Sequence, residues 1–71
     1  MRSKRNKVLG FNIKIERLRK GLTQFDLAEK TNVSVSSIGL IERGEQTPSA
    51  LLLFDIAKTL EIDINTLFKD V

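Results

Sequence analysis

The chain has 71 residues, a formal net charge of +3 and 41% hydrophobic residues, with no cysteine and no histidine. This length predicts one domain, and the lack of cysteine excludes disulfides and thiolate metal sites. The lack of histidine removes the commonest acid–base group and metal ligand, which argues against an enzyme and against a metal centre. No apolar run is long enough for a membrane span or a signal peptide, so we expect a soluble, cytoplasmic protein.

The charge is concentrated at the N-terminal end. Residues 1–20 contain eight Lys or Arg and one acid, whereas residues 21–71 contain four bases and eight acids. This cationic segment favours a polyanion as partner. Residues 1–6 are polar and lack hydrophobic periodicity, which predicts a flexible basic arm before a domain over residues 7–71. A solvated tail without a binding role is the alternative for the arm.

Two helical segments follow the arm. The first is predicted over residues 7–20 and ends at Gly21; its apolar stripe consists of Leu9, Ile13 and Leu18. The second begins at Thr23, which forms a capping-box pattern with Asp26, and runs to about residue 30. A short turn follows, in which Asn32 is the residue best suited to a left-handed conformation.

Three more helices complete the chain. The third is predicted over residues 34–42 with Gly44 as its stop, the fourth over about residues 50–60, and the last is short. Each begins with a capping residue, respectively Ser34, Ser49 and Asp63. No segment has the pattern of a strand. The sequence therefore predicts a compact all-α domain of five helices, in which the second and third form a helix-turn-helix.

Several residues then stand in a characteristic order and spacing: Gly21-Leu22-Thr23-Gln24, Leu27-Ala28-Glu29, Ile38, Ile41-Glu42-Arg43-Gly44 and Pro48-Ser49. This set resembles the Cro and lambda-repressor-like helix-turn-helix family, also called the xenobiotic-response-element family, over about residues 9–68. The resemblance implies a DNA-binding domain without a cofactor, with its third helix in the major groove. It also implies dimers that place two such helices roughly 34–36 Å apart.

The resemblance assigns base contacts to the exposed face of the third helix. The positions that match are Ser34, Val35, Ser36 and Leu40. For Leu40, packing against the fourth helix is an equal alternative. We also place Gly39 on this face, where a missing side chain permits close approach of DNA; a tolerated imperfection or tight helix packing is the alternative.

Phosphate contacts are implied on both sides of this face. They comprise Thr23 and Gln24 at the start of the second helix, and Arg43, Gln46, Thr47 and Ser49 around the loop after the third. Lys4, Arg5 and Lys7 are expected to reach along the backbone or into the minor groove. An ordinary exposed residue in a first turn is the alternative for Gln24, and a simple solvated turn is the alternative for each loop residue.

Two further roles follow from the resemblance. Arg17 and Glu42 match an ion pair that links the first helix to the end of the third, and a DNA contact is the alternative role for this pair. A dimer interface is expected at the apolar C-terminal end, with Ile62, Ile64, Leu67 and Phe68. Alternatively, these four residues complete the core of the monomer.

The expected reading face lacks the residues that pair bidentately with bases in its first turn. Arg, Lys, Asn and Gln are the usual readers of guanine and adenine. Here the first turn offers serine hydroxyls, while Val35 and Leu40 suit thymine methyls. We therefore expect a half-site that is rich in A·T pairs.

These observations favour a sequence-specific transcriptional regulator that binds double-stranded DNA as a homodimer on a palindromic operator. A phage-type repressor, a restriction–modification controller and an antitoxin all fit a chain of this kind. A protein-interaction module with the same fold, using the apolar positions of the third helix, is the alternative. A toxin or a polymerase would be its protein partner.

Overall fold

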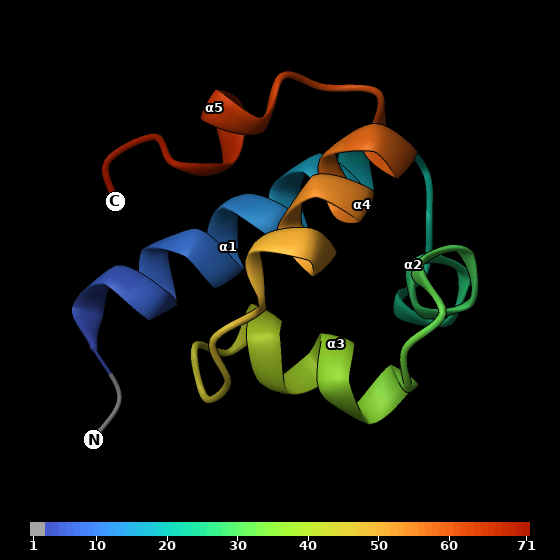
Figure 1. The fold of residues 1–71 in the computed structure, drawn as a ribbon, viewed down its shortest axis with the longest axis horizontal. Coiled ribbons are helices and arrows are strands. Elements are labelled where there is room, and N and C mark those ends of the chain that lie inside the picture. The colour runs from blue at the N-terminus through green and yellow to red at the C-terminus, as the bar shows by residue number, and fades with distance from the viewer. Residues whose placement is uncertain (1–2) are drawn as a thin grey trace.

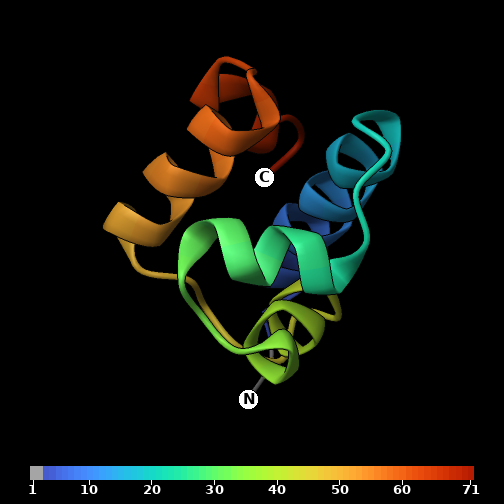
Figure 2. The ribbon, with the colours of Figure 1, turned by 90° about the vertical axis from the view of Figure 1, so that its right-hand side faces the viewer.

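A computed structural model describes residues 3–71. These residues form five α-helices and no strand, which confirms the fold predicted from the sequence. Figure 1 shows α1 crossing the middle of the molecule between α3 and the C-terminal segment with α5. Figure 2 shows α2 above α3, between α1 and α4. The helices are α1 (Lys4–Arg19), α2 (Gln24–Thr31), α3 (Val35–Glu42), α4 (Ala50–Leu60) and α5 (Ile64–Leu67).

All five helices contribute to one hydrophobic core. Burying a Leu or Ile side chain completely stabilises the fold by about 1.5–3 kcal/mol. Because the domain is small, the number of side chains that it can bury is limited. Those that are essentially inaccessible to water are Ile13, Leu27, Ile38, Ile41, Ile56 and Leu67.

Local signals set the ends of the helices. The predicted caps are confirmed, since Thr23, Ser34, Ser49 and Asp63 each accept a hydrogen bond from a backbone N–H in the first turn of α2, α3, α4 and α5. At the other end of α2, Asn32 adopts the predicted left-handed conformation with φ 59°. These contacts satisfy backbone groups that helix ends leave unpaired.

The first helix differs from the prediction in two ways. It begins at Lys4, because the Ser3 hydroxyl accepts a hydrogen bond from the Asn6 backbone N–H at 3.0 Å. Residues 4–6 are therefore its first turn, where we expected a flexible arm over residues 1–6, and residues 1–2 lie outside the described part. Towards the other end, Leu18 is 53% exposed and Arg17 takes the buried position, since it continues the four-residue spacing of the core stripe.

Gly10 and Gly44 let α1 and the end of α3 pack backbone against backbone. A Cβ added to Gly10 would stand 2.2 Å from the carbonyl oxygen of Ile41 and 2.7 Å from that of Glu42. Gly44 has φ 77°, and its added Cβ would stand 2.7 Å from the Cα of Lys7. A side chain at either glycine would therefore force the two helices apart.

Two features are absent from residues 3–71. No helix in this range is both long and apolar enough to cross a membrane. The same range contains no group of three or more His, Cys, Asp or Glu residues that could hold a metal ion.

Candidate nucleic-acid interface

The helix-turn-helix is held together by its connecting turn. The Thr31 hydroxyl donates to the carbonyl of Leu27 at 2.7 Å, and the Val33 N–H donates to the carbonyl of Ala28 at 3.0 Å. Ala28 itself is buried, as expected for a small residue between packed helices. The turn therefore fixes how α3 leaves α2.

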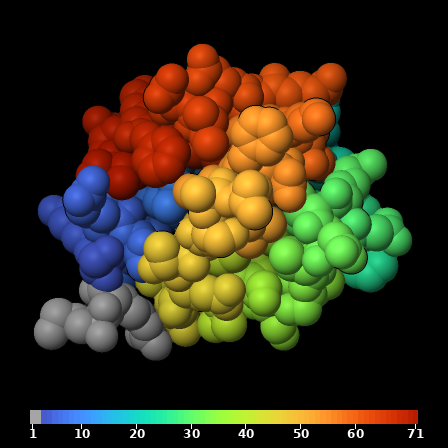
Figure 3. All heavy atoms as spheres, in the orientation of Figure 1, coloured from blue at the N-terminus to red at the C-terminus, as the bar shows by residue number. Residues whose placement is uncertain are grey.

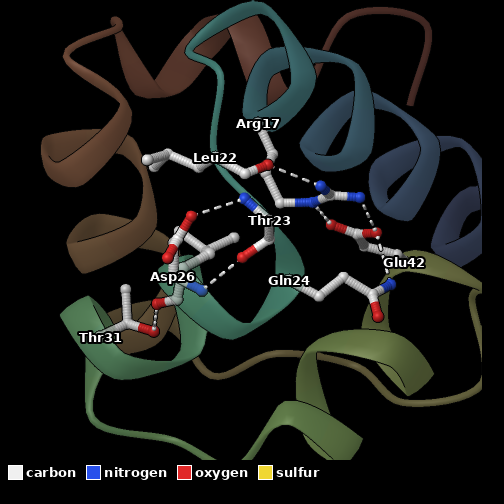
Figure 4. A network of polar contacts seen from close by, with 8 residues as sticks. Arg17, Leu22, Thr23, Gln24, Asp26, Thr31 and Glu42 are labelled. Carbon is white, nitrogen blue, oxygen red and sulfur yellow. Dashed lines mark hydrogen bonds and ion pairs between the residues drawn. The ribbon is translucent and has the colours of Figure 1, made fainter.

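A buried polar network ties α3 to the two helices behind it (Figure 4). Arg17 Nε and Nη2 donate to the two carboxylate oxygens of Glu42 at 2.7 and 3.0 Å, while Arg17 Nη1 donates to the carbonyl of Leu22 at 2.8 Å. Gln24 Nε2 donates to Glu42 Oε1 at 3.0 Å. Because the Arg17 and Glu42 side chains are only 7% and 2% exposed, this bidentate pair is shielded from water.

The N-terminal turn of α3 has less hydrogen-bonding capacity than the sequence indicated. The Ser34 hydroxyl accepts from the Ser37 backbone N–H and donates to the Ser37 hydroxyl, both at 3.0 Å. Ser34 thus makes the capping contact that the sequence predicted, and its contact with bases stays a prediction. Val35 is 41% exposed and Ser36 is also exposed, so these two side chains are the ones that the first turn presents to solvent.

A hollow lies on the outer side of α3. It is lined by Gln24, Val35, Ser36, Gly39, Leu40 and Arg43. Leu40 is half-buried, so it both packs and contributes to the surface. Gly39 is buried, and a Cβ added there would stand 3.1 Å from Arg43 Nη1. The protein's own Arg43 side chain therefore takes up the space above Gly39 that we expected to admit DNA.

The residues predicted to contact phosphate lie near this hollow, and several of them already make hydrogen bonds within the protein. Thr23 uses its N–H and its hydroxyl in the capping box with Asp26. The Ser49 hydroxyl caps α4. Thr47 is exposed and accepts a hydrogen bond from Asn6 Nδ2 at 2.5 Å, a contact between residues that lie far apart in the sequence. In the space-filling view, α3 and the loop that follows it form one continuous edge (Figure 3).

The basic residues at the N-terminus lie on a helix. Lys4 and Lys7 are exposed on the first two turns of α1. Arg5 Nε donates to the Val71 carbonyl at 3.1 Å, so this side chain reaches the C-terminal segment. The packing of Lys7 against Gly44 places this end of α1 beside the loop that follows α3.

The C-terminal end needs one correction. We expected Leu67 at the dimer interface, but it is 0% exposed and belongs to the monomer core, so it cannot contact a partner. Ile62 and Ile64 are half-buried against the same core, and Phe68 is 43% exposed. Asn12 of α1 holds this end in place, because its Nδ2 donates to the carbonyls of Leu67 and Lys69 at 2.9 and 2.8 Å.

The pKa of Asp26, at the start of α2 near this surface, is lowered. The Thr23 backbone N–H, and then the Thr23 side chain, hold the pKa of Asp26 below its ordinary value of 3.8. The carboxylate is therefore charged at neutral pH, at the N-terminus of α2 where the helix dipole favours a negative group.

Comparisons with known proteins agree with this geometry. The profile of the helix-turn-helix family matches residues 13–67. The chain is 40% identical over 60 residues to YazB, an uncharacterised HTH-type transcriptional regulator of Bacillus subtilis. The matched region covers 84% of this chain and 87% of YazB. The structure is similar to the restriction–modification controller protein C.AhdI of Aeromonas hydrophila, with a TM-score of 0.85, 30% identity, and coverage of 89% and 96% of the two chains.

A second controller protein, C.Esp1396I, is 37% identical with a TM-score of 0.83, over 96% of this chain and 90% of that one. The matched region contains both helices of the motif and the network that anchors α3. The chain therefore belongs to the helix-turn-helix family of DNA-binding transcriptional regulators.

Proposed function

We propose that this protein is a sequence-specific regulator that places α3 in the major groove of double-stranded DNA and binds a palindromic operator as a homodimer. The observation that carries the proposal is the asymmetry of α3. Its inner side is fixed by the buried Arg17–Glu42 pair, while Val35 and Ser36 on its outer side are exposed beside Gln24. A rigid helix with an exposed outer face is what groove recognition requires.

Electrostatic attraction supplies much of the proposed affinity. Lys4 and Lys7 are exposed near the loop with Gln46 and Thr47, so these groups flank α3 where a DNA backbone would pass. Each phosphate that a protein neutralises steepens the log–log salt dependence by about 0.9. Arg5 contributes less in this role, because its Nε is held by Val71.

The proposed half-site is rich in A·T pairs. Val35 is the exposed apolar side chain in the first turn of α3 and suits a thymine methyl, while Ser36 offers a hydroxyl to base edges. Leu40, at the edge of the same hollow, supplies a second apolar contact.

The proposed dimer uses the apolar surface near the C-terminus. Phe68 is exposed there, and Ile62 and Ile64 retain part of their surface. On α4, Leu51 and Phe54 are 79% and 56% exposed and lie about one turn apart, which extends the apolar surface available to a second copy. Sedimentation at micromolar concentration tests this dimer, and Phe68→Ser and Phe54→Ser should shift it towards the monomer.

Binding to a labelled random-sequence duplex at low and at moderate salt tests the proposed function. We expect clear binding at low salt that weakens steeply as salt rises. A Lys4→Ala/Lys7→Ala variant should flatten the salt dependence by up to about 2 in log–log slope. The matched control is Lys58→Ala. Lys58 is exposed in the last turn of α4, at the end of that helix farther from α3 (Figure 1). This variant should leave the salt slope unchanged.

The absence of DNA binding at low salt would contradict this function and favour a protein-interaction module or an antitoxin that uses the same surface. Among regulators, similarity to two proteins named as restriction–modification controllers favours a controller role over a phage-type repressor. The genes that flank this one would test that choice directly.

A further inference from the structure

We propose that Arg43 and Gln24 together read one guanine–cytosine pair within the otherwise A·T-rich half-site. This inference rests on the proposed function and assigns it a specificity determinant. It replaces the phosphate contact that the family resemblance implies for Arg43. Three observations carry it: where the guanidinium lies, how it is oriented, and which group stands beside it.

The guanidinium of Arg43 lies on the outer face of α3. Arg43 stands four residues, about one turn, after Gly39. Its Nη1 would be 3.1 Å from a Cβ added to Gly39, so the side chain folds back along the helix over this glycine. It therefore lines the same hollow as Ser36 and Leu40, which face the groove in the proposed complex.

A neighbouring carboxylate orients the guanidinium. Arg43 Nε donates to Glu45 Oε2 at 3.0 Å. With Nε held in this way, the Nη1 and Nη2 groups remain as a pair of parallel donors, and guanine presents two matching acceptors, O6 and N7, in the major groove.

Gln24 adds an acceptor next to these donors. Its Nε2 donates to the buried Glu42 carboxylate, which can only accept, and this fixes the orientation of the amide. Gln24 Oε1 then faces the hollow, 3.9 Å from the Cβ position of Gly39, the same point that Arg43 Nη1 approaches. A G·C pair presents two acceptors from guanine followed by the N4 donor of cytosine. Two donors from Arg43 and one acceptor from Gln24 match this order.

Gly39 gives both side chains room. Glycine within a helix is less favourable than alanine, yet a methyl group here would stand too close to Nη1 and displace the guanidinium by a few tenths of an ångström. Gly39→Ala should therefore keep or raise the melting temperature while weakening selection for this one base pair.

Selection of bound duplexes from a random pool tests the inference, with wild type and Arg43→Lys treated in parallel. The lysine keeps the charge but loses the planar pair of donors. We expect the wild-type half-site to contain one fixed G·C pair, and Arg43→Lys to lose it while other positions are unchanged. In competition between duplexes that differ at this pair, wild type should discriminate by roughly 5- to 150-fold.

Lys7→Ala is the matched control for a phosphate contact. It should weaken binding to all sequences evenly and lower the salt slope by about 1, without changing the selected bases. If Arg43→Lys leaves the selected bases unchanged, or Arg43→Ala behaves as Lys7→Ala does, the inference is wrong while the DNA-binding function stands. If wild type enriches no sequence at all, sequence-specific DNA binding fails as well.

Discussion

The two ends of α3 differ in what surrounds them. At the C-terminal end, Glu42 is buried in an ion pair and Gly44 packs on α1. At the N-terminal end, Val35 and Ser36 face solvent. The buried groups at one end of this eight-residue helix thus fix its position, while the exposed side chains along its outer face are available for recognition. Substitutions of the buried groups should change stability, and substitutions of the exposed side chains should change DNA binding.

The largest loss of stability should follow removal of the buried carboxylate. Glu42→Ala leaves the Arg17 guanidinium charged and unpaired, which typically costs about 3–5 kcal/mol. Thermal denaturation should show a large fall in melting temperature or an unfolded protein. The control is Glu29→Ala, an exposed glutamate on α2, which should change stability by no more than about 0.5 kcal/mol. An unchanged melting temperature for Glu42→Ala would mean that the pair does not anchor α3.

Gly10→Ala should destabilise the same end by overpacking. The new methyl group would meet the backbone oxygen of Ile41, which cannot rotate away, so we expect a loss of about 3 kcal/mol in urea unfolding. Gly21→Ala is the control, because no atom lies within 4 Å of its added Cβ and only its φ of 78° opposes the change. That control should cost about 1–2 kcal/mol. Equal losses for the two variants would remove the case for a tight contact between α1 and α3.

The smallest effect should be a dependence of stability on acid. The pKa of Asp26 is lowered in the folded protein. The ionised carboxylate therefore contributes its full stabilisation of the fold above pH 3.8, and this stabilisation is lost as the pH falls through the lowered pKa. Asp26→Asn should therefore melt below wild type at neutral pH, and the gap should narrow in acid. A gap that stays constant with pH would show that the charge of Asp26 does not stabilise the start of α2.

The helix ends were predictable because they depend on neighbouring residues. Thr23 and Asp26 form their capping box within one turn, and Asn32 takes its left-handed conformation where the pattern indicated. The prediction that Leu18 continues the apolar stripe of the first helix was wrong, because Leu18 is exposed and Arg17 is buried in its place. The pattern of apolar residues does not show that Arg17 has a buried carboxylate partner in Glu42.

The details of the surface depend on contacts between distant residues. Nothing near Gly10 in the sequence shows that the end of α3 lies against it, and the bond from Asn6 to Thr47 spans 41 residues. The family resemblance placed Arg43 near DNA, and the position of Gly39 on the third helix placed it on the same face. Only the structure shows that the arginine lies over the glycine and beside Gln24, which changes its proposed partner from phosphate to guanine.

Amide chemical-shift mapping of the labelled protein with a selected duplex tests the central claim, that the outer face of α3 meets DNA. If that face binds DNA, the largest changes should occur at Gln24, Val35, Ser36 and Arg43. The amide chemical shifts of residues on the outer side of α1, around the exposed Phe11 and Leu18, should not change. Large changes on that side of α1, with α3 unaffected, would show that α3 does not meet DNA.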